Sequence, residues 1–381
     1  MINLDHIKKA ILDVCFRPVD LEVPNLKPDV VLRLGDDPEL FDSTQNAPPQ
    51  QGDPKIRLYD DVIIWPAQSV AHRGGSIAFD TFIDDERVAH LEKLNALRHY
   101  PTWQQDGWVA TIESVYPTEN YYHFLVDSLP RVWALHHPVL RNVPITLYLT
   151  RPLSSEKRRL LCALLPSNVS LRKTHRFTRL HVDRYVHLPY LSKDRVGHNP
   201  DQTETSGGFI PQEYLDYFRK HMLQRAKSAS GPFPERIFVS RRGASMRRLK
   251  NEKEVVDFLE ERGFVTVRPE EYSLAEQARL FDSARVVVAQ HGAALANLMY
   301  MREGAVVEIF SSSDTPQHYE QFARTLDLRY EPITLGRGWK NADALLPVDR
   351  LAQALDAVCT ARSGDREGVS CEQPAKPEEM K

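Results

Sequence analysis

The chain has 381 residues, of which 42% are hydrophobic and 27% are charged, a length and composition typical of two folded domains. Its 49 Lys and Arg residues against 52 Asp and Glu residues give a formal net charge of -3, which lacks the basic surplus of a general nucleic-acid-binding protein. Any basic binding site must therefore be local.

The cysteine spacing and the hydropathy pattern bear on the cellular compartment of the protein. The four cysteines lie far apart, so free thiols in a reducing compartment are expected rather than a disulfide framework. No stretch approaches the roughly 20 apolar residues that a membrane-spanning helix needs. We expect a cytoplasmic protein with no nucleic-acid partner and at most peripheral association with a membrane.

The first half of the chain mixes strand and helix patterns, in an order that the sequence leaves open. Short apolar runs predict strands at residues 29–34, 61–65, 108–113, 145–149 and 185–189. Helical patterns lie near residues 120–137, 154–165 and 211–226. Residues 36–54 are expected to form a surface loop, and residues 226–235 are the best candidate for a linker.

The second half alternates strands and helices regularly. Strands are predicted at residues 236–240, 264–267, 285–289, 305–310 and 328–333, and helices at 251–262, 273–282, 317–326 and 347–361 and directly after Gly292. This alternation predicts a doubly wound α/β unit. Asn251 with Glu254, and Ser273 with Glu276, have the spacing of capping boxes at two helix starts. The charged, proline-containing residues from 362 onward are expected to be disordered.

The stretch from 285 to 310 predicts an anion site. It combines a buried strand, a turn at His291, Gly292 and Ala293, a small-residue helix that contains Asn297, and a second strand that carries Glu308. A strand that enters a helix through glycine brings backbone N–H groups and the positive end of the helix dipole to one point. His291 could bind a phosphate there and Glu308 could hold ribose hydroxyls. Alternatively, His291 caps the helix or packs in an interface, and Glu308 pairs with an arginine.

A basic cluster follows the strand predicted at 236–240. Arg241 and Arg242 leave this strand, and Arg247 and Arg248 come just before the next helix. Guanidinium groups bind paired phosphate oxygens through two hydrogen bonds and keep their charge. A run of charges usually faces water, but the position between a strand end and a helix start favours diphosphate binding.

A third cluster lies in the first half. His123 and Asp127 are four residues apart in a predicted helix and therefore share one face. The carboxylate could take a proton from an acceptor hydroxyl while the imidazole positions it. Arg131 extends the stripe, and spacing alone favours a His–Asp–Arg salt bridge instead. Pro130 predicts a kink or a restart of the helix.

These motifs resemble those of a known family. Residues 238–310 are similar to the signature half of glycosyltransferase family 61, and residues 120–131, NYYHFLVDSLPR, resemble its upstream motif. The resemblance implies an α/β fold of the GT-B type, in which two Rossmann-like domains face a cleft. The expected domains are an acceptor-side domain at 1–228 and a nucleotide-sugar-binding domain at 229–346, followed by a terminal helix at 347–361 that could cross back and by the tail at 362–381.

The resemblance also implies an activity. The protein would be an inverting glycosyltransferase that moves a sugar from a nucleotide sugar, expected to be UDP-linked, to a hydroxyl of a glycan or lipid-linked glycan, with no essential metal or other cofactor. Recognition of the nucleotide diphosphate falls on Arg241, Arg242, Arg247, His291, Gly292 and Ala293. The sequence departs from the common form of the family at Ala294, where glycine is frequent. The expected setting is bacterial capsule or lipopolysaccharide synthesis, in the cytoplasm or at the inner membrane.

The expected mechanism is direct displacement at the anomeric carbon. Asp127 acts as the base, with His123 beside it, and the arginines and helix-start amides stabilise the leaving diphosphate, a role that a divalent metal plays in other enzymes. A sugar-nucleotide-binding module without catalysis is the alternative, because it would keep the same phosphate elements. A dehydrogenase is disfavoured because no G-x-G-x-x-G follows an N-terminal strand.

Overall fold

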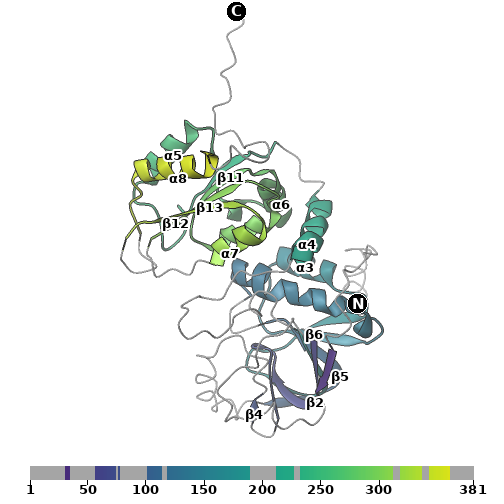
Figure 1. The fold of residues 1–381 in the computed structure, drawn as a ribbon. Coiled ribbons are helices and arrows are strands. Elements are labelled where there is room, and N and C mark those ends of the chain that lie inside the picture. The colour runs from purple at the N-terminus through teal and green to yellow at the C-terminus, as the bar shows by residue number, and fades with distance from the viewer. Residues whose placement is uncertain are drawn as a thin grey trace, which may run out of the picture. The chain divides into compact units, whose positions relative to one another are not determined.

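The computed structural model describes residues 31–34, 56–73, 76–77, 101–113, 118–188, 212–226, 232–311, 318–336 and 343–360. Its contacts divide the chain into two compact units, residues 1–202 and residues 203–381, whose elements are drawn in Figure 1. The loop expected at 36–54 and the tail expected from 362 onward lie outside the described residues. Among the helices that are described, none is both long and apolar enough to cross a membrane.

The first unit is built on an eight-stranded sheet with the order β4-β3-β2-β8-β5-β6-β7, in which β1 also pairs with β2. The strands are β1 (Val31–Leu34), β2 (Ile56–Trp65), β3 (Val70–Arg73), β4 (Ser76–Ile77), β5 (Thr102–Thr111), β6 (Ile145–Leu149), β7 (Val169–Lys173) and β8 (Arg179–His187). The helices are η6 (His123–Ser128), η7 (Leu129–His136), η8 (Pro138–Leu140) and α3 (Ser155–Leu164).

This sheet is mixed. Strands β8, β5, β6 and β7 are parallel to one another, whereas β2 pairs antiparallel with both β8 and β3. The parallel strands place their carboxyl ends at one edge, where Glu113 follows β5, Thr150 follows β6 and Leu188 follows β8. Ligands of α/β proteins collect at such an edge, so it is the part of this unit where side-chain chemistry is expected.

The second unit has a five-stranded sheet in which every pair of neighbouring strands is parallel. Its elements are α4 (Gln212–Arg225), β9 (Arg236–Val239), α5 (Glu252–Glu260), β10 (Val265–Val267), η10 (Pro269–Glu271), α6 (Leu274–Ser283), β11 (Val286–Gln290), η11 (Ala293–Tyr300), β12 (Ala305–Phe310), α7 (His318–Thr325), β13 (Arg329–Thr334) and α8 (Val348–Thr360). Strands β11 and β12 are buried along their whole length, because helices cover both faces. Figure 1 shows α5 and α8 on one face of the sheet and α6 and α7 on the other. The predicted α/β class is confirmed in both units.

The strand order β10-β9-β11-β12-β13 creates a topological switch point. The chain passes from β9 outward to β10 and then returns across β9 to β11, so the connections on the two sides of this point run in opposite directions. In such sheets the ligand binds outside the carboxyl ends of the two strands at the switch point. Residues 240–242 follow β9 and residues 291–293 follow β11, so both predicted phosphate elements lie there.

One of the two predicted capping boxes is confirmed. The Ser273 hydroxyl accepts from the Glu276 N–H, and the Glu276 carboxylate accepts from the Ser273 N–H at 2.8 Å. The capping box predicted at Asn251 is wrong, because its side-chain amide instead binds the backbone of Leu346, donating to the carbonyl oxygen and accepting from the N–H. The Asn251 side chain therefore bonds to the segment before α8 instead of to the N–H groups at the start of α5.

Helix α4 packs within the second unit, although the sequence placed its residues in the first domain. Arg219 donates to the carbonyl oxygens of Met299 at 3.2 Å and Met301 at 2.7 Å, and Phe218 stacks on Tyr300 with ring centroids 5.7 Å apart. These bonds satisfy carbonyl groups at the end of η11, which would otherwise lack partners. The contacts therefore divide the chain at residues 202 and 203 rather than at residues 228 and 229.

Candidate functional site

The carboxyl end of β11 turns into η11 at Gly292. The carbonyl oxygen of Gly292 accepts hydrogen bonds from the Leu295 N–H at 3.0 Å and from the Tyr319 hydroxyl at 2.8 Å. A Cβ atom on Gly292 would collide with Nη1 of Arg241. Glycine thus lets the Arg241 guanidinium lie directly against the turn, which joins the elements that follow β9 and β11.

The guanidinium of Arg247 adds a second positive charge to this turn. Burial lowers the pKa of both arginines, and the charge of Arg247 lowers that of Arg241 further. The Nε atom of each is buried and has no hydrogen-bond partner among the residues that the structure describes. Buried donors without acceptors are costly, and neighbouring like charges repel, unless an anion joins them. The pair is therefore suited to an anion with several oxygen atoms.

The backbone of Arg247 is held in an unusual conformation. Its φ of 59° lies in the left-handed region, which residues other than glycine rarely adopt. The Gln290 side-chain amide donates to the Arg247 carbonyl oxygen at 2.6 Å and so ties this backbone to the end of β11. Strain that the surrounding structure maintains in this way is a frequent feature of ligand-binding sites.

The other arginines of the basic cluster have different surroundings. Arg242 is exposed, and its backbone N–H donates to the Ser240 hydroxyl at 3.1 Å. Arg248 is held by Asp343, whose carboxylate accepts from its Nη2 at 2.7 Å and from its backbone N–H at 2.8 Å. The structure therefore brings Arg241 and Arg247 to the turn, leaves Arg242 in solvent and pairs Arg248 with a carboxylate.

His291 and Glu308 form a buried pair behind the turn. His291 Nδ1 and Glu308 Oε1 lie 2.6 Å apart, and Glu308 Oε2 accepts from the Tyr330 hydroxyl at 2.5 Å. The exposed fraction of Glu308 is 0%, and that of His291 is 6%. The Glu308 carboxyl thus meets a histidine and a tyrosine, where the sequence suggested ribose hydroxyls or an arginine.

The shifts in pKa favour the neutral form of both members of this pair. Burial, together with the charges of Arg247 and Arg241, lowers the pKa of His291 to about 3. Burial raises the pKa of Glu308 to about 8, although the hydrogen bond from Tyr330 acts in the opposite direction. The short contact is therefore a hydrogen bond between a protonated carboxyl and a neutral imidazole rather than an ion pair.

The remaining predicted residues of this site belong to η11. Ala293 is the first residue of η11 and is half-buried, and the predicted helix is of the 3₁₀ type. Asn297 is fully buried, and its side-chain amide donates to Gln277 Oε1 at 3.1 Å, toward α6. Gln277 in turn donates to the Tyr272 carbonyl oxygen at 3.0 Å. The contacts described for Asn297 therefore lead to α6 rather than to the arginines.

In the first unit, His123 and Asp127 contact each other as their spacing predicts. Both lie in η6, a π-helix whose start is bonded to Asn120, since the Asn120 side chain accepts from the Tyr122 N–H at 2.9 Å. His123 Nδ1 and Asp127 Oδ2 are 2.6 Å apart, with 23% of the histidine side chain exposed and 0% of the aspartate side chain. A buried carboxylate thus orients a partly exposed imidazole, an arrangement found where histidine acts as a base.

Arg131 lies one helix further along and is completely buried. Its guanidinium donates to the carbonyl oxygens of Leu188 at 2.6 and 2.9 Å and of Glu113 at 3.0 Å, and to the Ser69 hydroxyl at 3.0 Å. It therefore joins the segments that follow β5 and β8. The predicted restart at Pro130 is confirmed, because the π-helix ends at Ser128 and a 3₁₀ helix begins at Leu129.

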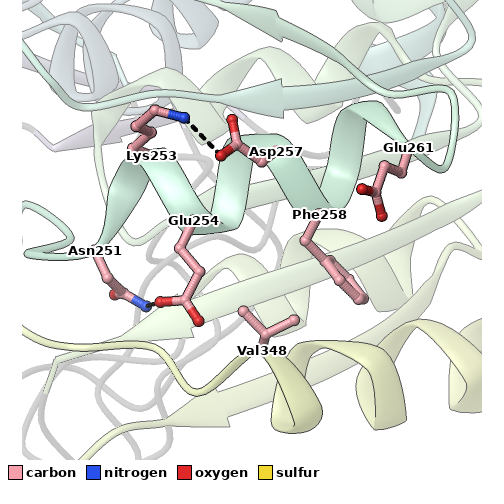
Figure 2. A pocket seen from close by; sticks show the side chains of 7 residues that line it. All are labelled: Asn251, Lys253, Glu254, Asp257, Phe258, Glu261 and Val348. Atoms are coloured by element: carbon pink, nitrogen blue, oxygen red, sulfur yellow. Dashed lines mark hydrogen bonds and ion pairs between the residues drawn. The ribbon is translucent and has the colours of Figure 1, made fainter.

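Figure 2 shows a surface groove between α5 and α8, with a volume of about 560 Å³. Its lining residues are Asn251, Lys253, Glu254, Asp257, Phe258, Glu261 and Val348. Three of them are carboxylates, and the lysine is paired with Asp257 at 2.7 Å. A lining of this charge disfavours a diphosphate, and none of the predicted site residues lies in the groove.

Two side chains of the site were missed in the sequence. Tyr330 on β13 binds Glu308, and Tyr319 on α7 binds the carbonyl of Gly292. Both come from elements that follow β12 in the chain, and no spacing rule connects them with the turn. Only the strand order could have indicated Tyr330, because β13 is the parallel neighbour of β12, which carries Glu308.

Among curated proteins, no match to the chain was found. Residues 121–307 match the family model described as Glycosyltransferase 61, a range that contains the His123–Asp127 pair, the arginine pair and the turn at Gly292. These residues are therefore similar to glycosyltransferase family 61, and this similarity supports glycosyltransferase activity.

Proposed function

We propose that the protein transfers a sugar from a UDP-linked donor to a hydroxyl of a bacterial surface glycan or of its lipid-linked precursor. The observation that carries this proposal is the pair of half-buried guanidinium groups, Arg241 and Arg247, at the switch point of a parallel sheet. A diphosphate supplies the oxygen atoms that their Nε donors lack. The choice of uridine, the surface-glycan acceptor and the cytoplasmic setting follow from the family resemblance.

In this proposal the two units have separate roles, as in a GT-B enzyme. The second unit holds the nucleotide, with the phosphates at Arg241, Arg247 and the turn at Gly292. The first unit serves the acceptor, because the His123–Asp127 pair lies after β5, near the carboxyl ends of its parallel strands. Exposed Arg242 is free to approach a ligand from solvent.

The chemical step that we propose is a direct displacement with inversion. The acceptor hydroxyl attacks the anomeric carbon as the bond to the nucleotide oxygen breaks, and its proton passes to the His123–Asp127 pair. The exposures favour His123 as the member that meets the acceptor, with buried Asp127 orienting the ring and stabilising the positive charge that it gains. The guanidinium groups of Arg241 and Arg247 stabilise the negative charge on the departing diphosphate.

Nucleotide binding is expected to be independent of divalent metal. The positive charge of Arg241 and Arg247 is fixed in the site, so the diphosphate does not need a metal to neutralise it. UDP should raise the melting temperature by the same amount in EDTA and in magnesium or manganese. A shift that disappears in EDTA and returns with manganese would contradict the metal-independent part of the proposal.

A transfer assay separates an enzyme from a binding module. The protein is incubated with a UDP-sugar, with and without oligosaccharide acceptors, and both free UDP and the extended acceptor are measured by mass spectrometry. We expect UDP release that depends on the acceptor, together with a product that has gained one sugar. Tight binding of UDP-sugars without release under any acceptor would instead favour the non-catalytic module.

A further inference from the structure

The His291 ring is fixed on several sides. Nδ1 lies 2.6 Å from Glu308 Oε1. The Phe310 ring stacks on the imidazole at 5.3 Å with an interplanar angle of 26°, and the Tyr319 ring lies 5.4 Å away at 58°. An aromatic ring packed in this way has one orientation, so the ring edge that carries Nε2 is turned away from Glu308.

Among the residues that the structure describes, the charged and titratable groups around the pair come from three neighbouring elements. They are Tyr330 on β13, Glu320 and Tyr319 on α7, and Arg241 and Arg247 in the loop after β9. The arginines disfavour a third positive charge on the imidazole, and Glu320 disfavours a negative charge on Glu308. Arg247 favours that negative charge, but burial of the carboxyl is the larger effect. Neutral forms of both His291 and Glu308 are therefore the favoured state.

In the neutral form of the pair, the partners of Glu308 determine which ring nitrogen of His291 carries a proton. When Glu308 is protonated and Tyr330 donates to its Oε2, the carboxyl proton lies on Oε1 and is donated to His291 Nδ1, 2.6 Å away. Nδ1 is then the acceptor, and a neutral imidazole must carry its own proton on Nε2. The pKa of Glu308, raised by burial to about 8, agrees with this protonation state at pH 7.

We propose that Glu308 is a positioning residue, which orients His291 and keeps its proton on Nε2 so that this N–H donates to an anion held by Arg241 and Arg247. The nature of the anion rests on the proposed function. The orientation and the tautomer of the ring rest only on contacts within the second unit.

Ionisation of Glu308 reverses the arrangement. A carboxylate can only accept, so above about pH 8 the histidine must donate through Nδ1 and lose its proton from Nε2. The site then presents a lone pair to the anion instead of an N–H group. Anion binding is therefore expected to be strong below this pH and to weaken by roughly tenfold above it.

The tautomer is tested without any ligand. Two-bond ¹⁵N–¹H spectra of protein labelled at histidine show which ring nitrogen carries the proton, and His291→Gln identifies the His291 signals by their loss. We expect the Nε2–H form at pH 6.5 and the Nδ1–H form at pH 9.5. An Nδ1–H ring or an imidazolium at pH 6.5 would overturn the proposal.

Two variants test the role of the carboxyl. Glu308→Gln places an amide N–H where the protonated carboxyl has its O–H, so the Nε2–H form should persist at both pH values. Tyr330→Phe removes a donor that lowers the pKa of Glu308, so the change of tautomer should move to higher pH. A tautomer that changes at the same pH in the Gln variant as in wild type would show that Glu308 does not control it.

The binding role is tested by calorimetry with UDP and with pyrophosphate, each at pH 7 and pH 9.5. In Glu308→Gln the affinities at pH 7 and pH 9.5 should differ less than in wild type, for both ligands. If Glu308 instead held ribose hydroxyls, the variant would lose affinity for UDP alone. If wild type bound neither ligand, the proposed function would fail, while the spectra would still decide how the ring is positioned.

Discussion

Asp127→Asn is expected to lower the rate of sugar transfer by about 100-fold to 10,000-fold, the usual contribution of a general base. The amide has nearly the shape of the carboxylate but cannot stabilise a positive charge on His123, whose Nδ1 lies 2.6 Å from it. UDP binding should remain close to wild type, because the phosphate elements belong to the second unit. The rate is measured by product formation, and the affinity for UDP by calorimetry.

Two further variants complete this test. Asp106→Asn alters an exposed carboxylate in β5 and should transfer sugar at the wild-type rate. His123→Ala should lose activity to a similar extent as Asp127→Asn if the two side chains act as one unit. An Asp127→Asn protein that melts at a lower temperature but transfers at nearly the wild-type rate would make the pair a structural contact, and the base would lie elsewhere.

Arg241→Ala is expected to weaken UDP binding by roughly tenfold or more, because charge-assisted hydrogen bonds contribute about 1.5 to 3 kcal/mol each. Arg241→Lys keeps the charge but loses the planar fork, so it should also bind more weakly, though less severely. The affinities are measured by calorimetry in EDTA.

Arg248→Ala is the matched control, because Arg248 lies in the same loop but is held by Asp343. It should bind UDP with the affinity of wild type. If the Arg241 variants bound UDP with the affinity of wild type, the loop after β9 would be an ordinary solvated surface that does not bind the diphosphate.

Gly292→Ala tests the same contact by geometry. Its methyl group must displace the Arg241 guanidinium, so this variant should show part of the loss of UDP affinity.

The fold of the second unit could be predicted closely, and the reason lies in its burial. Strands such as β11 and β12 are covered on both faces, so each appears in the sequence as an unbroken apolar run. In the first unit, β7 alternates between half-buried and exposed residues, and its sequence VSLRK gave no strand prediction. The polar start of β5 before Trp108, where the register shifts, was missed for the same reason.

The candidate site was partly accessible from the sequence. The approach of Arg241 to Gly292 follows from the rule that ligand sites form where neighbouring parallel strands end. The surroundings of Glu308 could not be predicted, because Tyr330 reaches it from the next strand and burial decides its protonation. The i, i+4 contact of His123 with Asp127 was predicted, whereas the π-helical backbone that carries it leaves no periodic pattern.

The proposed function requires that the switch point of the second unit bind the diphosphate of a nucleotide sugar. It is tested most directly by calorimetric titration of the wild-type protein in EDTA with uridine, UMP, UDP and a set of UDP-sugars. Affinity is expected to rise from uridine to UDP, because the phosphates meet Arg241 and Arg247, and at least one UDP-sugar should bind as well as UDP. Failure of every diphosphate to bind at millimolar concentration, or equal affinity for uridine and UDP, would contradict it.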